Sequence, residues 1–425
     1  MRSRCVPLCF LAALLLIVFA WADDWPQWRG PERTGVSKET GLLKEWPKDG
    51  PKLLWKNGEV GGGFSTPAVV GDRIYLMSNT RDEESAVALD VKDGKQVWST
   101  PVGKVGKNTG QAQYPGTRST PTVDGDRIYV LGSDGDLACL GRDNGKAAWA
   151  KNLKNDFDGK PGLWAYAESP LIDGDVLVCT PGGDKATMAA LNKKDGTVIW
   201  KCAVKEGDAA GYASPIIAEV GKVKQYVQFV GGGVIGVDAK TGQLLWRYDH
   251  TKDEAANIPT PVFHDDCVFT STSRNGSGLN RIKVDKDAVS SEEVYFNTTK
   301  LNSIGGVVRV GAYVYGTNAK GELVCMDFKT GEVKWHAAAV GTASVTYADG
   351  MLYVRAQGGT GFGRESAKPK VALVEATPDG YKEKGRFEQP DHGDRPAWPH
   401  PVVANGRLYL RDQGVLLCYD VKAEK

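Results

Sequence analysis

The sequence lacks the short motifs that mark many catalytic and nucleotide-binding sites. It has no Gly-x-Ser-x-Gly nucleophile motif, no Gly-rich phosphate loop and no His-Glu-x-x-His zinc motif. Histidine is scarce, with five residues in the whole chain, so few side chains are available for general acid or base catalysis near neutral pH. No catalytic residue can be assigned from motifs.

An excess of charge of one sign is also missing. The chain carries 53 Lys and Arg against 52 Asp and Glu, for a formal net charge of +1, and no Lys/Arg stripe is visible. Nucleic acids and anionic membranes attract strongly basic surfaces. We therefore expect neither nucleic acid nor an anionic membrane as the main partner.

A helical period of apolar residues is absent, and a β-type repeat is present instead. A unit of roughly 45 to 50 residues recurs along the chain, the period that is typical of propeller blades. The first half of the unit, as in residues 65–76, is Ser/Thr-x-Pro, an apolar strand, a Gly-Asp turn and a second strand. The second half, as in residues 236–246, is a strand, an Asp, a Gly-containing turn and a terminal Trp.

The repeat predicts an all-β fold, an eight-bladed β-propeller of four-stranded blades. The last unit ends near Asp420 without a fourth strand, and residues 51–56 form a fourth strand without a first half. We expect this N-terminal strand to complete the last blade, which leaves no unpaired edge between the first and last blades. Seven units end in a large flat side chain: Trp98, Trp149, Trp200, Trp246, Tyr295, Trp335 and Phe387.

Cysteine usage gives no disulfide framework. Cys139, Cys325 and Cys418 occupy equivalent positions in separate blades, too far apart to bridge, so we interpret them as small core residues. A bridge between Cys179 and Cys202 within one blade stays open.

The two ends of the repeat region suggest three segments. Residues 1–22 are predicted to be a signal peptide, because a basic start and an apolar run precede the small-x-small sequence of residues 20–22. An uncleaved anchor is the alternative. Residues 23–50 are a Trp/Pro-rich N-terminal strap, either an arm that packs its aromatics on the propeller or a strap that shapes a site. Residues 51–425 are expected to form the propeller of an exported, periplasmic or extracellular monomer that does not span a membrane after cleavage.

The pattern Asp-x-x-Thr-Gly-x-x-x-Trp occurs at residues 238–246 and 327–335, with degenerate copies at 90–98 and 143–149. It resembles the repeat of the quinoprotein (pyrroloquinoline quinone, PQQ) propeller superfamily. Together with Trp-Pro-Gln-Trp-Arg-Gly-Pro at residues 25–31, it makes the chain similar to exported bacterial quinoprotein-like propellers of unassigned activity. The resemblance implies that each Trp packs one blade on its neighbour, and it indicates the fold more strongly than the activity.

Two branches of that superfamily offer different functions. The alcohol dehydrogenases clamp PQQ with a disulfide between adjacent cysteines and use a carboxylate-bound calcium and a catalytic Asp. This chain has no adjacent cysteines and no Cys-x-x-Cys-His haem signal, so PQQ as a cofactor has no support from cofactor-site residues. The other branch is the eight-bladed lipoprotein of outer-membrane barrel assembly. Its blade number and length match better, although its lipidation cysteine is missing here.

A ligand site is expected where the segments that precede the innermost strands surround one mouth of the channel. Aromatic faces suit sugar or quinone rings, and a guanidinium suits a carboxylate. No metal site is expected, because the Asp-Gly-Asp turns lack a further carboxylate at calcium-loop spacing. The candidate ligand-binding residues are Arg118, Trp164, Tyr166, Glu168, Tyr212, Asn257, Trp398 and His400.

Structural roles compete with binding at several of these positions. Arg118 and Glu168 are alternatively a pair that fills the channel, and the aromatic residues are alternatively packing. His400 lies between two prolines and is either a general base or a hydrogen-bonded structural histidine.

Three functions follow from these observations. The first is a binding or scaffold module for an envelope protein or a polysaccharide. The alternative is a PQQ-dependent or related dehydrogenase that oxidises an alcohol or sugar at a non-standard site, with Trp164, Trp398 and Arg118 as candidates. A glycan-cleaving role would need two facing carboxylates, for which Glu168 and Asp394 are the main candidates.

Overall fold

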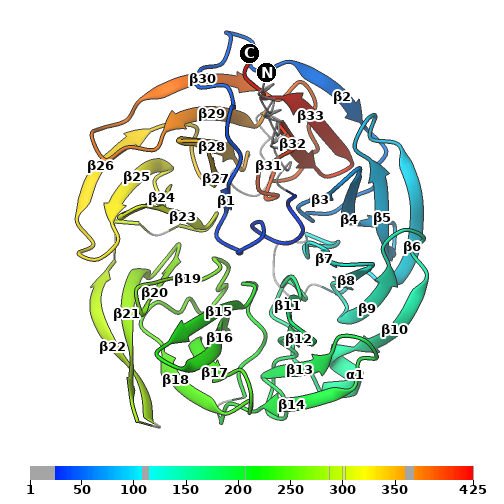
Figure 1. The fold of residues 1–425 in the computed structure, drawn as a ribbon, viewed down its shortest axis with the longest axis vertical. Helices are drawn as coiled ribbons and strands as arrows, with labels where there is room; N and C mark the ends of the chain where they lie inside the picture. The colour runs from blue at the N-terminus through cyan, green and yellow to red at the C-terminus, as the bar shows by residue number, and fades with distance from the viewer. Residues whose placement is uncertain are drawn as a thin grey trace, which may run out of the picture.

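Eight β-sheets stand around a central channel in the computed structural model of this chain (Figure 1). The structure describes residues 24–107, 114–205, 207–286, 288–298, 300–301, 303–358 and 368–424. The predicted eight-bladed β-propeller is confirmed, and each blade is an antiparallel meander whose first strand lies nearest the channel. The predicted signal peptide lies outside the described residues.

The first four blades follow the chain from blue to green in Figure 1. Blade 1 is β3 (Ala68–Val70), β4 (Arg73–Thr80), β5 (Glu83–Asp90) and β6 (Gln96–Lys104). Blade 2 is β7 (Thr122–Asp124), β8 (Arg127–Leu131), β9 (Asp136–Gly141) and β10 (Ala147–Asn152). Blade 3 is β11 (Leu171–Asp173), β12 (Val176–Cys179), β13 (Met188–Asn192) and β14 (Val198–Cys202). Blade 4 is β15 (Ile216–Val220), β16 (Val223–Val230), β17 (Gly233–Asp238) and β18 (Leu244–Tyr248).

The other four blades complete the circle. Blade 5 is β19 (Val262–His264), β20 (Cys267–Thr272), β21 (Gly276–Asp285) and β22 (Ala288–Asn297). Blade 6 is β23 (Val307–Val310), β24 (Tyr313–Thr317), β25 (Glu322–Asp327) and β26 (Val333–Ala338). Blade 7 is β27 (Ala343–Ala348), β28 (Met351–Ala356), β29 (Lys370–Glu375) and β30 (Glu383–Glu388). Blade 8 is β31 (Val402–Ala404), β32 (Arg407–Asp412), β33 (Val415–Asp420) and the N-terminal β2 (Leu53–Asn57).

The ring closes as the sequence predicts, with β2 antiparallel to β33. A side chain adds to this closure. The guanidinium of Arg411, fully buried in blade 8, donates to the carbonyls of Ser65 and Met77 in blade 1 at 3.0 and 2.6 Å. It also donates to the carbonyls of Gly61 and Gly62 at 3.2 and 2.8 Å. Blades 8 and 1 are therefore joined by a buried cation as well as by the strand.

Neighbouring blades are joined at the outer rim by the aromatic residue of the fourth strand. In blade 8 the indole of Trp55 lies over Gly94 of blade 1, so closely that a Cβ on this glycine would be 2.6 Å from the ring. The ring N–H or O–H donates to a backbone carbonyl of the next blade in six cases: Trp55 to Val91, Trp98 to Arg142, Trp149 to Lys193, Trp200 to Ala239, Tyr295 to Phe328 and Trp335 to Thr377.

Two aromatics, Trp246 and Phe387, do not donate to a carbonyl of the next blade, because the segment that each ring meets differs from the repeat. Trp246 donates to Gln225 of its own blade, because blade 5 replaces the Gly-containing turn with the long β21–β22 hairpin. Phe387 of blade 7 lies against Gly50 and Trp46 of the N-terminal segment.

A β-bulge aims each of these aromatics. In all eight blades the register between the third and fourth strands shifts beside the aromatic position. In blade 1, Trp98 faces Ala88 and Gln96 faces Leu89, so Val97 has no partner across the sheet. A bulge turns the local strand and redirects its side chains. The skipped residue points to solvent, which explains the exposed apolar side chains Leu54, Val97, Ile199 and Val294.

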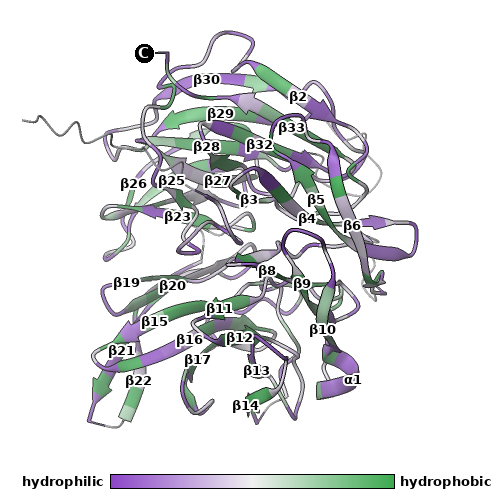
Figure 2. Cartoon of the chain, turned by 45° about the vertical axis from the view of Figure 1, so that its right-hand side comes forward, coloured by the Kyte–Doolittle hydropathy of each residue, from purple (hydrophilic) through white to green (hydrophobic). Residues whose placement is uncertain are grey.

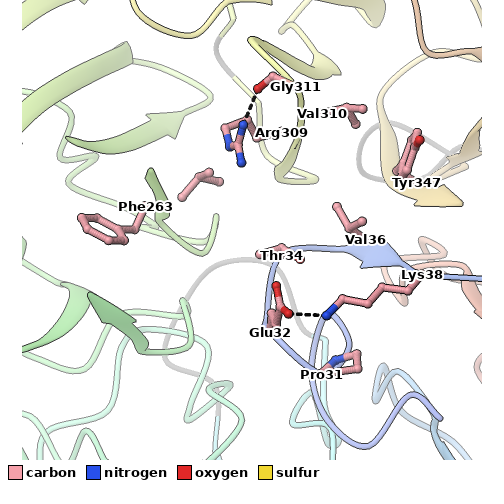
Figure 3. A pocket seen from close by; sticks show the side chains of 11 residues that line it. Pro31, Glu32, Thr34, Val36, Lys38, Phe263, Arg309, Val310, Gly311 and Tyr347 are labelled. Carbon is pink, nitrogen blue, oxygen red and sulfur yellow. Dashed lines mark hydrogen bonds and ion pairs between the residues drawn. The ribbon is translucent and has the colours of Figure 1, made fainter. Parts of the chain in front are cut away.

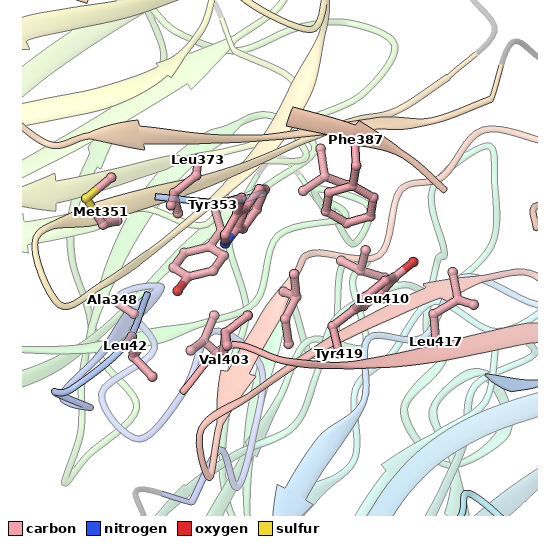
Figure 4. Close-up of a cluster of buried hydrophobic side chains, with 14 residues drawn as sticks. Leu42, Ala348, Met351, Tyr353, Leu373, Phe387, Val403, Leu410, Leu417 and Tyr419 are labelled. Atoms are coloured by element: carbon pink, nitrogen blue, oxygen red, sulfur yellow. The ribbon is translucent and has the colours of Figure 1, made fainter. Parts of the chain in front are cut away.

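The core lies between the blades. Strands β28 and β29 of blade 7 are mostly hydrophobic, whereas the outer strand β6 contains hydrophobic and hydrophilic residues in turn (Figure 2). Between blades 7 and 8, Tyr353, Leu373 and Leu410 pack with Leu42 and Trp46 of the N-terminal segment (Figure 4). The six described cysteines are buried and free, so Cys179 and Cys202 do not form a bridge.

Residues 24–37, called here the central segment, cross the middle of the ring (Figure 1). β1 (Val36–Ser37) pairs in parallel with β27, which gives blade 7 a fifth strand that the repeat does not predict. The central segment contacts all eight blades, in order through Trp25 and Val69, Pro26 and Val123, Arg33 and Pro170, Arg33 and Pro215, Trp28 and Thr260, Arg29 and Val307, β1 and β27, and Trp28 and His400.

One short helix interrupts the β structure. α1 (Leu153–Phe157) follows β10, and its N-cap Asn152 accepts hydrogen bonds from the backbone N–H groups of Lys154 and Asn155. Within the described part of the chain, no helix has the length and apolar character needed to cross a bilayer.

We expect Arg411→Met to lower the free energy of unfolding by about 3 kcal/mol, because four blade-1 carbonyls lose a buried charged donor. Urea unfolding measures this loss. Arg281→Met is the control, since Arg281 is exposed on β21, and its effect should stay within about 0.5 kcal/mol. Equal midpoints for the two variants would show that the guanidinium does not hold blades 8 and 1 together.

A comparison of two glycines of blade 1 distinguishes the energetic cost of disturbing an aromatic contact from the cost of backbone strain. Gly94 and Gly71 both have positive φ, +72° and +58°, but a Cβ meets the Trp55 ring only at Gly94 and open space at Gly71. Both alanine substitutions therefore cost strain, and Gly94→Ala should cost about 1–3 kcal/mol more. Thermal unfolding of both variants tests this, and identical losses would contradict the role of the Trp55 contact.

Candidate functional site

The predicted site residues lie on the strand-start face, defined here as the face of the ring on which the innermost strands begin. The opposite face, on which these strands end, is the strand-end face. The structure sorts the eight candidates into two groups. Arg118, Trp164, Tyr212 and Trp398 are partly exposed, whereas Tyr166, Glu168, Asn257 and His400 are buried.

Three aromatic rings and Arg118 gather where blades 8, 1 and 2 meet. The ring centroid of Trp398 lies 4.6 Å from that of Phe64 and 4.8 Å from that of Tyr114. The guanidinium carbon of Arg118 lies 5.5 Å from the Phe64 centroid, within cation–π range. Arg118 also donates to the carbonyls of Tyr114 and Gly116.

A second aromatic pair lies on blades 3 and 4. The rings of Trp164 and Tyr212 are 5.9 Å apart, and the Tyr212 hydroxyl accepts the backbone N–H of Trp164 at 3.1 Å. Burial lowers the pKa of Arg118 to about 10, and the nearby Tyr212 and Glu84 oppose this shift. Arg118 therefore lies close enough to Tyr212 to interact with it electrostatically, and its guanidinium stays charged at neutral pH.

Two of the buried candidates hold the ring together. The Tyr166 hydroxyl donates to the carbonyl of Pro181 at 2.8 Å inside the core of blades 2 and 3. The Asn257 amide donates to the carbonyls of Val230 and Gly231 and accepts the backbone N–H of Asp253. Neither side chain offers a free polar group to a ligand.

Glu168 does not pair with Arg118. Its carboxylate accepts the backbone N–H of Thr180 at 2.6 Å and the amide of Gln228 at 3.0 Å. Burial raises the pKa of Glu168 to about 7, while these hydrogen bonds and the charge of Arg33 lower it. Asp394, the other candidate for a facing pair of carboxylates, has a side chain that is 90% exposed. The two carboxyl groups thus occupy unlike environments.

His400 is enclosed by the central segment. Its ring makes an edge contact with Trp28 at 4.7 Å, and its backbone N–H donates to Thr66. Burial, with the charges of Arg29 and Arg355, holds the pKa of His400 well below its usual value. The imidazole is therefore neutral and shielded, which argues against a general base. Its buried Nδ1 has no hydrogen-bond partner among the described residues, so His400 is held by packing and not as the hydrogen-bonded histidine of the alternative.

Arg29 and Arg33 were not among the predicted residues, although they are the two cations at the centre of the ring. Arg33 donates to the carbonyls of Ser169 and Pro215 at 3.1 and 2.9 Å, and Arg29 donates to that of Val307 at 2.5 Å. Burial lowers the pKa of Arg29 to about 10 and that of Arg33 to about 9. The sequence hints at the role of these two arginines only by placing them in a Trp/Pro-rich segment outside the repeat.

A cavity of about 260 Å³ lies elsewhere, on the strand-end face, beside the central segment. None of the eight predicted residues lines it. In the described residues, no three His, Cys, Asp or Glu side chains converge as a metal site would require. Arg118 and the aromatics of the strand-start face are suited to bind a ligand, and the two carboxyl groups considered above, Glu168 and Asp394, do not form a matched pair beside them.

Comparison with known sequences identifies relatives of the ring. The family described as outer membrane protein assembly factor BamB matches residues 32–112, 102–337 and 297–370. BamB of Burkholderia pseudomallei (strain K96243) is 24% identical over 257 residues, 58% of this chain and 59% of that protein. The tetrathionate hydrolase of Acidithiobacillus ferrooxidans is 24% identical over 295 residues, 66% of this chain and 54% of that protein. The chain thus spans less than two thirds of the length of these curated relatives.

Solved structures show the same fold at low identity. The crystal structure of BamB from Moraxella catarrhalis has a TM-score of 0.56 and 15% identity, and the match covers 83% of this chain and 95% of that one. The quinohemoprotein alcohol dehydrogenase from Comamonas testosteroni has a TM-score of 0.51 and 12% identity, over 95% and 81%. At these identities the likeness concerns the fold alone.

The buried carboxyl group of Glu84 predicts a pH dependence. Burial raises its pKa from 4.5 to about 7, against hydrogen bonds from Ser133. Between these two values the folded state holds a proton that the unfolded chain has released, so this group makes stability fall as pH rises. Glu84→Gln keeps the neutral form, and we expect its stability relative to wild type to rise by about 3 kcal/mol between about pH 4.5 and 8.

Urea unfolding at several pH values measures this difference. Glu59→Gln, at an exposed position, is the control and should show no such change. A Glu84→Gln difference that is constant with pH would mean that Glu84 is already ionised in the folded protein at pH 5.

Proposed function

This chain belongs to the family of the outer membrane protein assembly factor BamB, and on that premise we propose that it is an exported scaffold whose strand-start face binds a protein of the bacterial envelope. The partner contributes an extended segment with apolar side chains and a carboxylate. A binding or scaffold role is supported at the level of the family. The partner, and a task in outer-membrane protein assembly, belong to the proposal.

The observation that carries the proposal is the group of Phe64, Tyr114, Trp398 and Arg118. Aromatic residues and arginine are the side chains that most often dominate the energy of protein interfaces. Arg118 has five N–H donors, and two backbone carbonyls use part of this capacity. Because the rings pack against one another at 4.6 and 4.8 Å, they are held in place before a partner arrives.

The exposed apolar residues of the outer rim do not compete with this face. Leu54, Val97, Ile199 and Val294 lie in four different blades, each at the bulge of its fourth strand. Leu53 and Val198, next to Leu54 and Ile199, are exposed as well, but one or two apolar side chains per blade are normal on a protein surface.

The residues do not fit PQQ held as in the alcohol dehydrogenases. Such a site needs adjacent cysteines, and the six described cysteines are free and buried in separate strands. It also needs a cluster of carboxylates for calcium, and the described part of the chain contains none. We therefore derive no redox step. A polysaccharide would also suit the aromatic faces, but the family favours a protein.

The test is capture of partners from the envelope of the source bacterium with tagged full-length protein and a crosslinker, followed by affinity measurement with the purified partner. We expect Trp398→Ala and Arg118→Gln each to weaken binding at least about tenfold, as hot-spot residues do. Ile199→Ala and Arg281→Gln are the controls, since both residues are exposed on outer parts of the blades. Circular dichroism spectra show that the variants are folded.

Each other result contradicts part of the proposal. Equal affinity of all four variants would place the interface away from the strand-start face. Binding of cell-wall polysaccharide without protein would replace the partner class. Saturable PQQ binding with dye-linked alcohol oxidation, lost in Arg118→Gln, would support the dehydrogenase instead.

A further inference from the structure

The cavity on the strand-end face is built by two parts of the chain that are far apart in sequence. The central segment and its continuation form one wall, and the ends of the innermost strands of blades 5, 6 and 7 form the other (Figure 3). Its volume is about 260 Å³. The lining residues are Pro31, Glu32, Thr34, Val36, Lys38, Val262, Phe263, Arg309, Val310, Gly311 and Tyr347.

Arg309 supplies a half-buried cation to this cavity. Its guanidinium donates to the carbonyl of Gly311, which leaves further N–H donors for other acceptors. Burial lowers its pKa, and the charge of Asp265 partly offsets this. Asp265 itself forms an ion pair with Lys329 at 2.9 Å and lies 3.4 Å from the ring Nε2 of His264, whose pKa is lowered mainly by burial. The guanidinium thus lacks a carboxylate of its own at ion-pair distance among the described residues.

The other charges of the lining cancel. Lys38 and Glu32 form an ion pair at 2.5 Å, and their side chains are 64% and 62% exposed. An exposed pair of this kind stabilises a protein by at most about 1 kcal/mol. Arg309 remains as the net positive charge of the lining.

The rest of the wall is apolar and aromatic. Val36, Val262 and Val310 line the cavity together with Tyr347, whereas the ring of Phe263 points away from the centre of the cavity in Figure 3 and packs against the core between blades 4 and 5. A ligand that is anionic throughout would leave these side chains without a partner. A ligand with an apolar body and one anionic end would use both features.

We propose that this cavity binds a monocarboxylate with an aromatic or aliphatic body, of the size of one acylated amino acid or of the last residue of a peptide. The volume lies just below the range of about 300–1,000 Å³ of drug-sized ligand sites, which limits the ligand to this size. The carboxylate pairs with Arg309, and the body lies against Val36, Val310 and Tyr347.

This site goes beyond the proposed function, because it lies on the opposite face of the ring. Its ligand contacts the N-terminal segment and three blades at once, so binding stabilises the association between them. A ligand that binds only the folded state raises the free energy of unfolding with its concentration. The site therefore has a stability readout that does not depend on any partner of the strand-start face.

The experiment is calorimetric titration of the purified full chain with N-acetyl-L-phenylalanine, with its neutral amide as the matched ligand. We expect saturable binding of the acid, at least about tenfold weaker binding of the amide, and the same loss for Arg309→Gln, because a charge-assisted hydrogen bond is removed in both cases. Arg127→Gln is the control, since Arg127 starts a second strand in blade 2, away from the cavity. A tripeptide ending in Phe distinguishes a peptide C-terminus from a free acylated amino acid.

Three results would overturn the proposal. One is no saturable binding of the acid or the tripeptide up to about 10 mM, beyond the weakest useful affinity. Another is equal affinity for acid and amide. The third is binding that survives Arg309→Gln but is lost in Arg118→Gln, which would assign the ligand to the strand-start face. Thermal unfolding of Arg309→Gln without ligand shows whether this variant is folded.

Discussion

The buried guanidinium groups of Arg29 and Arg33 tie the blades to the centre of the ring. Neither group has a salt-bridge partner among the described residues, and both donate to backbone carbonyls at the start of innermost strands. A buried charge is costly unless its hydrogen bonds are made, and a buried carbonyl is costly when left unpaired. Each arginine makes its own hydrogen bonds and gives the buried carbonyls a donor. The pKa of Arg29 is about 10 and that of Arg33 is about 9, so both stay charged at neutral pH. The two faces of the propeller are separated because this segment occupies the middle.

The outer rim follows a different rule, which is local and repeated. A bulge in the fourth strand aims an aromatic ring at a glycine and a carbonyl of the next blade, and it leaves the skipped residue in solvent. The two exceptions support this rule. Trp246 finds its hydrogen bond in its own blade where the next turn is missing, and Phe387 uses Gly50 of the N-terminal segment. The exposed apolar residues of the rim are thus a consequence of blade packing.

The fold could be predicted from the sequence because every blade repeats the same pattern of strands, turns and a terminal aromatic residue. The orphan strand at residues 51–56 and the incomplete last unit predicted the closure of the ring, and the resemblance of the repeat to the quinoprotein superfamily predicted the contacts of the terminal aromatics between blades. The candidate site was harder to predict. Trp164 and Tyr166 come from one segment, yet Trp164 is partly exposed and Tyr166 is buried, and only the path of the backbone decides this. Arg29 and Arg33 escaped prediction because their partners are carbonyls, which any residue supplies.

Blade packing and ligand binding use different residues, which explains how one fold can serve unlike functions. Blade packing uses an aromatic ring, a glycine, a carbonyl and a bulge, all at the outer rim or between strands. The segments that lead into the innermost strands lie outside this packing at the outer rim, and although some of their side chains, such as Tyr166 and Asn257, join neighbouring blades, their partly exposed positions are free to differ from blade to blade. Proteins named as an assembly factor, a tetrathionate hydrolase and an alcohol dehydrogenase accordingly share sequence or fold with this chain. In the two proposals the ligands are recognised by Trp398 and Arg118 on one face and by Arg309 on the other, at positions that the repeat leaves unspecified.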